Sequence, residues 1–240
     1  LRGVGFVQVP TTLLAQVDSS VGGKVGVNLK AGKNLVGAFY QPQLVLCDLD
    51  TLKTLPKREL RAGLAEVIKY GIIDDATLFR RLERRLPALL KLDAKELAHV
   101  VARSCQIKAK VVEEDEREGG LRAILNYGHT IGHALEAISS YGKYLHGEAI
   151  SIGQVAASKI SRDQHGLGQA EVERIEALFT AAGLPTTVAL SKKDTLKLLA
   201  AMKLDKKVIG GQVKFVLAKS IGQVAFGIDV PKATIKASLQ

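Results

Sequence analysis

Histidine is the residue type whose spacing most clearly suggests chemistry in this sequence. Three of the five histidines, His129, His133 and His146, lie within 18 residues. In LNYGHTIGHALE the first two are four apart, so on a helix they share one face with Asn126 and Glu136. A polar face on a packed helix is costly unless it meets a metal, a ligand or water, and imidazole and carboxylate are natural ligands for zinc. A solvated or mutually hydrogen-bonded histidine pair explains the spacing equally well.

A carboxylate on a second predicted helix is a candidate partner for these histidines. In RAGLAEVIKYGII, Glu66 and Lys69 are three apart and lie away from the apolar stripe of Leu60, Leu64, Val67 and Ile68. The small residues Ala62 and Gly63 on that side leave room for another group to approach. Taken alone, the pair also fits a surface ion pair worth only a few tenths of a kcal/mol.

Two further segments combine glycines with charged residues that could bind a ligand. SSVGGKVGVNLKAGKNLVGAF offers Lys24 and Lys33 to a phosphate, although it lacks both the GxxxxGK[ST] and the GxGxxG spacing. In KAKVVEEDEREGGLR, Lys108, Glu118 and Arg122 could line one cavity with the histidine helix. Gly-rich turns are common, and a charged run is ordinarily a solvated helix end, so each segment is weak by itself.

The elements that must position these residues fall into two zones. Residues 1–56 are rich in glycine, with strands predicted at 4–9 and 44–48 and a short helix between them capped by Thr11 or Thr12. From Lys57 the pattern is helical, and its last part reads as a β-hairpin around Lys219 and Ser220. After the helix that carries Glu66, we expect helices near 75–86, 95–112, 123–139, 147–163, 169–182 and 192–202.

Composition narrows the class of protein. Apolar residues make up 47% of the chain, which supports a substantial core, and no apolar run approaches the ~18–20 residues of a membrane span. Cys47 and Cys105 form neither a CxxC site nor a disulfide framework, which favours the cytoplasm. The net charge of +10 suggests nucleic acid, but the aromatic content of 5% and the lack of Trp disfavour it. An anionic small molecule explains the positive charge equally well.

Taken together, the segments resemble the 3-dehydroquinate synthase family. The resemblance rests on VPTTLLAQVDSSVGGKVGVN, GKNLVGAFYQP, TLPKRELRAGLAEVIKYGII, KAKVVEEDEREGGLRAILNYGHTIGHALE, HGEAI and DKK, in family order. It implies an α/β remnant of a nucleotide-binding domain over 1–56 and a mainly α-helical metal- and substrate-binding domain with a small C-terminal β-hairpin over 57–240. It also implies a cytoplasmic, homodimeric carbon-oxygen lyase that uses NAD and zinc or cobalt. Such an enzyme converts 3-deoxy-D-arabino-heptulosonate 7-phosphate to 3-dehydroquinate and phosphate, with no nucleic-acid or membrane partner.

The resemblance also implies roles for individual residues. The metal ligands would be Glu66, His129 and His146, which moves His133 from the metal to the substrate pocket. The other pocket residues with catalytic roles would be Asp18, Lys69 and Glu118. The substrate carboxylate would meet Lys108 and Arg122, and its phosphate would meet Lys24, Asn34, Asn126 and Lys206, with Arg2 reaching across a dimer interface. NAD would contact Thr11, Thr12, Lys24, Lys33 and the turn formed by Thr51, Leu52, Lys53 and Thr54.

The departures from the family pattern are few. Val25 stands where a Thr is usual, and Gln154 where a Met is frequent. The chain begins at Leu1, and the resemblance implies a preceding nucleotide-binding half with a Gly-rich turn for the pyrophosphate. We therefore expect this chain alone to bind NAD weakly and to show little activity. The alternatives are a sister sugar-phosphate cyclase, such as a 2-deoxy-scyllo-inosose or valiolone synthase, and an inactive fragment acting only as a scaffold.

Overall fold

The computed structural model describes residues 4–29, 32–116, 119–139, 143–204, 208–209 and 212–239, and most of them are helical. The α-helices are α1 (Lys57–Ile73), α2 (Ala76–Leu90), α3 (Ala94–Glu114), α4 (His129–Ile138), α5 (His146–His165), α6 (Gln169–Ala181), α7 (Lys192–Leu204) and α8 (Lys232–Ser238). A π-helix, η1 (Ala15–Ser19), and two 3-10 helices, η2 (Leu49–Thr54) and η3 (Leu121–Asn126), complete the helical elements of this part.

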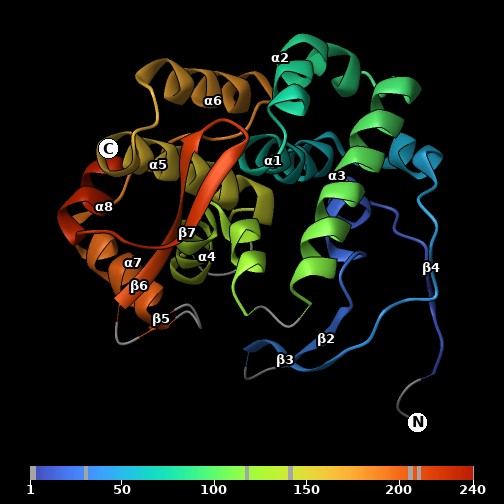
Figure 1. The fold of residues 1–240 in the computed structure, drawn as a ribbon, viewed down its shortest axis with the longest axis horizontal. Helices are drawn as coiled ribbons and strands as arrows, with labels where there is room; N and C mark the ends of the chain where they lie inside the picture. Colours follow the sequence, from blue (N-terminus) through green and yellow to red (C-terminus); the bar gives the residue numbers. More distant parts are fainter. Residues whose placement is uncertain are drawn as a thin grey trace.

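The described strands form three small sheets. They are β1 (Val7–Gln8), β2 (Lys24–Leu29), β3 (Gly32–Phe39), β4 (Leu44–Val45), β5 (Val208–Ile209), β6 (Gln212–Ser220) and β7 (Gln223–Asp229). β1 pairs with β4 in parallel, β2 pairs with β3 antiparallel, and β5, β6 and β7 form an antiparallel sheet. The N-terminal strands, blue in Figure 1, lie to one side of the helical body, whereas β6 and β7 lie across it.

Two apolar clusters hold the helical body together. The first joins α1, α2, α3 and α6, and the second joins α4, α7 and α8. Helix α5 and strand β6 contribute to both: Val216 and Ala218 of β6 pack in the first cluster, whereas Phe215 and Leu217 pack in the second. This division follows from the strand period of two, which sends successive side chains to opposite faces. The elements that carry the polar candidate residues, α1, α4 and α5, therefore meet where the two clusters adjoin.

The structure confirms the expected fold class: a short α/β part, a mostly helical body and a C-terminal hairpin. The stripe predicted on α1 is buried, and Thr12 caps the first short helix by accepting a hydrogen bond from the backbone N–H of Ala15 at 3.1 Å. The hairpin turn falls at Ile221 and Gly222, two residues beyond the predicted position. No helix in the described part of the chain is both long and apolar enough to cross a membrane.

The local structure differs from the sequence-based expectation in two places. The helix predicted over 123–139 is instead η3 followed by α4, because Gly128 adopts a left-handed φ of 76° that ends one helix and starts the next at His129. Asn126 therefore does not share a helix face with the histidines. The Gly-rich segment, for which no strand was predicted, contains the antiparallel pair of β2 and β3, in which Val27 lies opposite Val36.

Asp75 provides a test of how α2 is held. Its carboxylate accepts hydrogen bonds from the backbone N–H groups of Thr77 and Leu78, both at 2.9 Å, and pairs with Arg103 at 2.6 Å. Burial alone would raise its pKa, but these donors outweigh it and lower the pKa below the ordinary 3.8. Replacing this N-cap (Asp75→Ala) should lower the free energy of unfolding by about 1–2 kcal/mol at pH 7.

The pH dependence of that loss follows from the direction of the shift. A lowered pKa contributes stability above pH 3.8, and the contribution disappears as the pH falls through the folded-state pKa. Urea unfolding at pH 7 and in stronger acid should therefore show the difference between wild type and Asp75→Ala shrinking in acid. Asp74→Ala is the matched control, because no cap contact is described for its side chain. An equal loss from Asp74→Ala would contradict the capping role.

Candidate metal and substrate site

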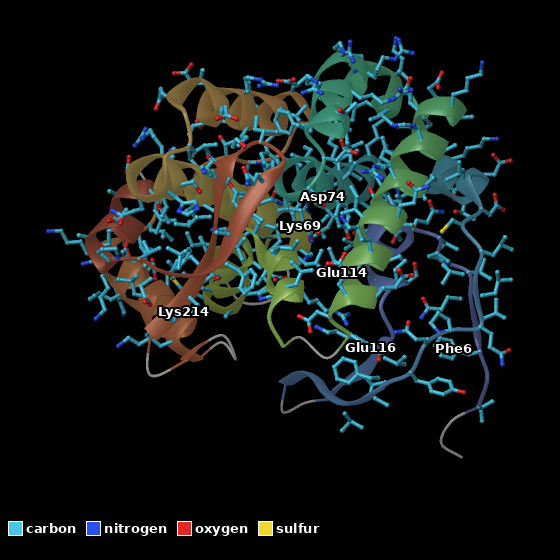
Figure 2. The ribbon with its side chains drawn as sticks, in the orientation of Figure 1. Phe6, Lys69, Asp74, Glu114, Glu116 and Lys214 are labelled. Atoms are coloured by element: carbon cyan, nitrogen blue, oxygen red, sulfur yellow. The ribbon has the colours of Figure 1, made fainter. Side chains whose placement is uncertain are left out.

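Glu66 and Lys69 form an ion pair inside the protein rather than on its surface. Their side chains are 0% and 1% exposed, and Lys69 lies among the helices of the body in Figure 2. The interpretation of the pair as a surface contact is therefore wrong. Helix α1 is buried on nearly every side by α2, α3, α5 and η1. Helix α5 approaches it so closely that a side chain on Gly147 would collide with the carbonyl oxygen of Ala62. This close approach places Glu66 near the start of α5.

Two histidines point their Nε2 atoms at the same oxygen of Glu66. The Nε2 of His129 lies 3.3 Å from Glu66 Oε1, and the Nε2 of His146 lies 3.5 Å from it. His129 is the first residue of α4, and His146 is the first residue of α5. Three elements distant in sequence thus place one carboxylate and two imidazoles around a common point.

His133 lies beside this group. His129, His133 and His146 each have one ring nitrogen within 4.8 Å of a ring nitrogen of the other two. The centroid of the His133 ring is 5.2 Å from that of His129 and 5.8 Å from that of His146. The spacing of the HxxxH motif therefore did indicate a real cluster, and His146 and Glu66, which the sequence analysis also named, lie beside it.

The charges of this group depend on burial and on each other. Burial alone would raise the pKa of Glu66, but Lys69 and His129 outweigh it and lower the pKa well below its usual range. Burial lowers the pKa of His129 to about 4, so its imidazole is neutral at pH 7. For His146, burial is outweighed by Glu136 and Glu66, which raise the pKa to about 9.

The donor set fits a divalent metal ion. Both carboxylate oxygens of Glu66 are buried, and among the described residues Oε2 is ion-paired with Lys69, whereas Oε1 faces only the two imidazole nitrogens. A buried oxygen in this state is costly, and a cation held by the carboxylate and two imidazole nitrogens would satisfy it. Zinc and cobalt accept both ligand types, and three protein ligands leave coordination positions for a substrate.

A second polar cluster centres on Asp18 in η1. Lys108 of α3 donates hydrogen bonds to the carboxylate of Asp18 at 2.8 Å and to its backbone carbonyl at 2.6 Å. The hydroxyl of Tyr70 on α1 donates to the same carboxylate at 3.0 Å. Burial would raise the pKa of Asp18, but Lys108 and, less strongly, Lys69 reverse this and lower it. Tyr70, next to Lys69 in sequence, thus joins this cluster to the helix that carries Glu66.

Arg122 is buried and engaged with the backbone. Its guanidinium donates hydrogen bonds to the carbonyl oxygens of Glu116 at 2.6 Å and Gly22 at 3.0 Å. Asn126, the last residue of η3, lies just before the turn that starts α4. The structure therefore places two buried cations, Lys108 and Arg122, on the side of the helical body that faces η1 and β2.

Gln16 lies beside the residues that the family resemblance implies for NAD, and the sequence analysis did not single it out. Its fully buried side-chain amide donates hydrogen bonds to the carbonyls of Pro10 at 3.2 Å and Asp48 at 3.0 Å, and lies 3.4 Å from the hydroxyl of Thr51. It thereby joins the Thr11–Thr12 segment to the turn of residues 51–54. A glutamine in a short helix carries no sequence signal for such a role.

The remaining predicted site residues lie elsewhere. Lys24 is exposed on β2, and Lys53 forms an exposed ion pair with Asp50 at 2.8 Å. Leu52 is fully buried and serves the core. Five predicted positions have side chains outside the described residues: Arg2, Lys33, Asn34, Glu118 and Lys206.

Fold and site together define a class: a helical domain with a buried carboxylate–histidine centre suited to a divalent metal, preceded by a short α/β segment. The chain belongs to the 3-dehydroquinate synthase family. The family profile for the 3-dehydroquinate synthase C-terminal domain matches residues 63–208, and the profile for the N-terminal domain matches residues 1–62.

Individual relatives agree with this assignment. The 3-dehydroquinate synthase of Desulforamulus reducens is 54% identical over 241 aligned positions, which cover 100% of this chain and 66% of the relative. The chain thus spans just under two thirds of the length of the curated relatives it matches.

Two solved structures share the fold at 30% identity. The 2-epi-5-epi-valiolone synthase of Streptomyces hygroscopicus, with NAD+ and Zn2+ bound, superposes with a TM-score of 0.90 over 99% of this chain and 66% of its own. A 2-deoxy-scyllo-inosose synthase, complexed with carbaglucose-6-phosphate, NAD+ and Co2+, gives a TM-score of 0.87 over 99% and 67%.

Proposed function

We propose that this chain is the metal- and substrate-binding part of a 3-dehydroquinate synthase, a carbon-oxygen lyase that converts 3-deoxy-D-arabino-heptulosonate 7-phosphate to 3-dehydroquinate and phosphate. The convergence of Glu66, His129 and His146 in a member of this family is the observation that carries the proposal. The division into residues 1–56, from a nucleotide-binding domain, and 57–240, the helical domain, belongs to the same proposal.

The proposed metal ligands are Glu66 Oε1 and the Nε2 atoms of His129 and His146. A zinc or cobalt ion at this point would act as a Lewis acid on a substrate hydroxyl. The protein itself supplies a buried carboxylate whose low pKa keeps it ionised, and a His129 imidazole that is neutral at pH 7. His133, Lys69, Asp18 and Glu118 are proposed to border the substrate pocket, where they would hold and transfer protons.

The substrate is a sugar-acid phosphate with charge at both ends. Lys108 and Arg122 are the proposed partners of its carboxylate, because both are buried cations, and binding would exchange some of their contacts with Asp18 and with backbone carbonyls for the substrate. Lys24, Asn34, Asn126 and Lys206 are proposed for the phosphate, with Arg2 acting across a homodimer interface. Thr11, Thr12, Lys24, Lys33 and residues 51–54 are proposed to contact NAD, which accepts a hydride when it is bound.

A sister sugar-phosphate cyclase is the second candidate, because the structures with TM-scores of 0.90 and 0.87 have those activities. The substrates of such enzymes lack the carboxylate, so they do not need both Lys108 and Arg122. Phosphate release by a full-length protein containing this chain, with NAD and zinc, distinguishes the two. The proposal expects turnover of the acid phosphate and at least tenfold less of glucose 6-phosphate, and the reverse preference would overturn it.

The ligand set is tested by metal content. After dialysis against zinc, we expect His129→Ala to lose its metal, because one of three protein ligands is gone. His133→Ala is the matched control on the same helix and should keep most of its zinc. Loss of zinc from His133→Ala together with retention by His146→Ala would show that the HxxxH pair binds the metal and that His146 does not.

A further inference from the structure

Glu136 joins the two helices that supply the proposed histidine ligands. It is on α4, seven residues or about two turns after His129, and therefore lies on the same face of that helix. Its Oε2 atom lies 3.2 Å from Nδ1 of His146, the first residue of α5. The Glu136 side chain is only 13% exposed, so this contact is largely shielded from water.

The other histidine has an equivalent outer contact. Nδ1 of His129 lies 3.1 Å from the carbonyl oxygen of Tyr127. Each imidazole thus has an oxygen acceptor at Nδ1 and faces Glu66 Oε1 with Nε2. An acceptor at Nδ1 fixes the proton on that atom, which leaves the lone pair of Nε2 available to a metal.

Glu136 differs from the carbonyl of Tyr127 because it carries charge. Binding of a metal to His146 requires that its imidazole give up its second proton, and with both imidazole ligands neutral the ionised Glu66, Lys69 and Glu136 leave the centre with one net negative charge. Without Glu136 the buried group would be neutral, and a divalent cation would be held less strongly. The carboxylate also makes the imidazole of His146 a stronger donor to the metal.

We propose that Glu136 is a positioning residue of the metal centre: it orients His146, fixes the proton on its Nδ1 and adds charge that retains the ion. This inference rests on the proposed function, in that His146 must be a ligand. Helix α4 would then contribute to the metal centre in two ways: His129 would be a ligand, and Glu136 would support the ligand His146 on the neighbouring helix α5.

The test is the zinc affinity of the purified chain, measured by competition with a chromophoric chelator. Glu136→Ala should weaken zinc binding about 10–100-fold. Glu136→Gln keeps an oxygen acceptor without the charge, so its zinc affinity should lie between those of Glu136→Ala and the wild type. Asp163→Asn is the matched control, because it removes one carboxylate from α5 about 25 Å away along the helix and should leave the affinity unchanged within about twofold.

A spectroscopic measurement separates positioning from a general structural effect. In the 15N-labelled zinc-loaded protein, the Nδ1 proton of His146 should give a slowly exchanging downfield signal that Glu136→Ala loses, while the signal from His129 remains. Unchanged affinity and an unchanged His146 signal in Glu136→Ala would overturn the proposal. A wild-type chain that binds no zinc would instead refute the proposed function.

Discussion

Replacing Glu66 with glutamine should lower the free energy of unfolding by about 3–5 kcal/mol and abolish zinc binding. The large effect on stability follows from burial: Lys69 is 1% exposed, and without the carboxylate its ammonium would be an unpaired charge in the interior. The loss of zinc follows from the position of Glu66 between the two Nε2 atoms. Urea unfolding and metal analysis measure the two effects separately.

A double variant separates the structural and metal-binding roles of Glu66. Glu66→Gln combined with Lys69→Met removes both buried charges, so most of the lost stability should return while zinc binding stays absent. If the double variant binds zinc as wild type does, Glu66 is not a ligand. If Glu66→Gln alone costs less than about 1 kcal/mol, the ion pair is not buried as the structure has it.

Gly147→Ala should destabilise the protein by about 1–3 kcal/mol and weaken zinc binding at least tenfold. The added methyl group would overlap the carbonyl oxygen of Ala62, so α1 and α5 would have to separate. That movement would draw His146, the neighbour of Gly147, away from Glu66. Chemical denaturation and chelator competition measure the two quantities.

Gly168→Ala is the matched control for this substitution. Its φ of −67° suits alanine, and the only described atom near the new methyl group is a carboxylate oxygen of Glu171 at 3.5 Å. It should change stability by less than about 1 kcal/mol and leave zinc affinity intact. Wild-type zinc affinity in Gly147→Ala would show that the close contact between α1 and α5 does not set the geometry of the site.

The histidine cluster was predictable because its signal is local. His129 and His133 are four apart, and the helical period of 3.6 alone brings them together. The burial of Glu66 and Lys69 was not predictable from α1, because it depends on α5, whose glycines permit a close approach that no local pattern reveals. An ion pair at the same spacing on a surface helix would have the same sequence.

The start of α4 shows another limit of local patterns. The apolar period continues from residue 123 to 138, which predicts one helix, but the left-handed conformation of Gly128 breaks it. The break makes His129 the first residue of α4, so its Nδ1 meets the carbonyl of Tyr127 and its Nε2 turns toward Glu66. Gln16 was missed for a related reason: its partners Pro10, Asp48 and Thr51 come together only in the fold.

The most direct test of the central claim is a crystal structure of the zinc-loaded chain, with the metal located by its anomalous scattering. The account predicts one ion bound by Glu66 and by the Nε2 atoms of His129 and His146, with nitrogen distances of about 2.0–2.1 Å. Glu136 should contact His146 without touching the metal, and His133 should face the remaining coordination positions. An ion bound by His129, His133 and His146, with Glu66 still paired only to Lys69, would contradict it.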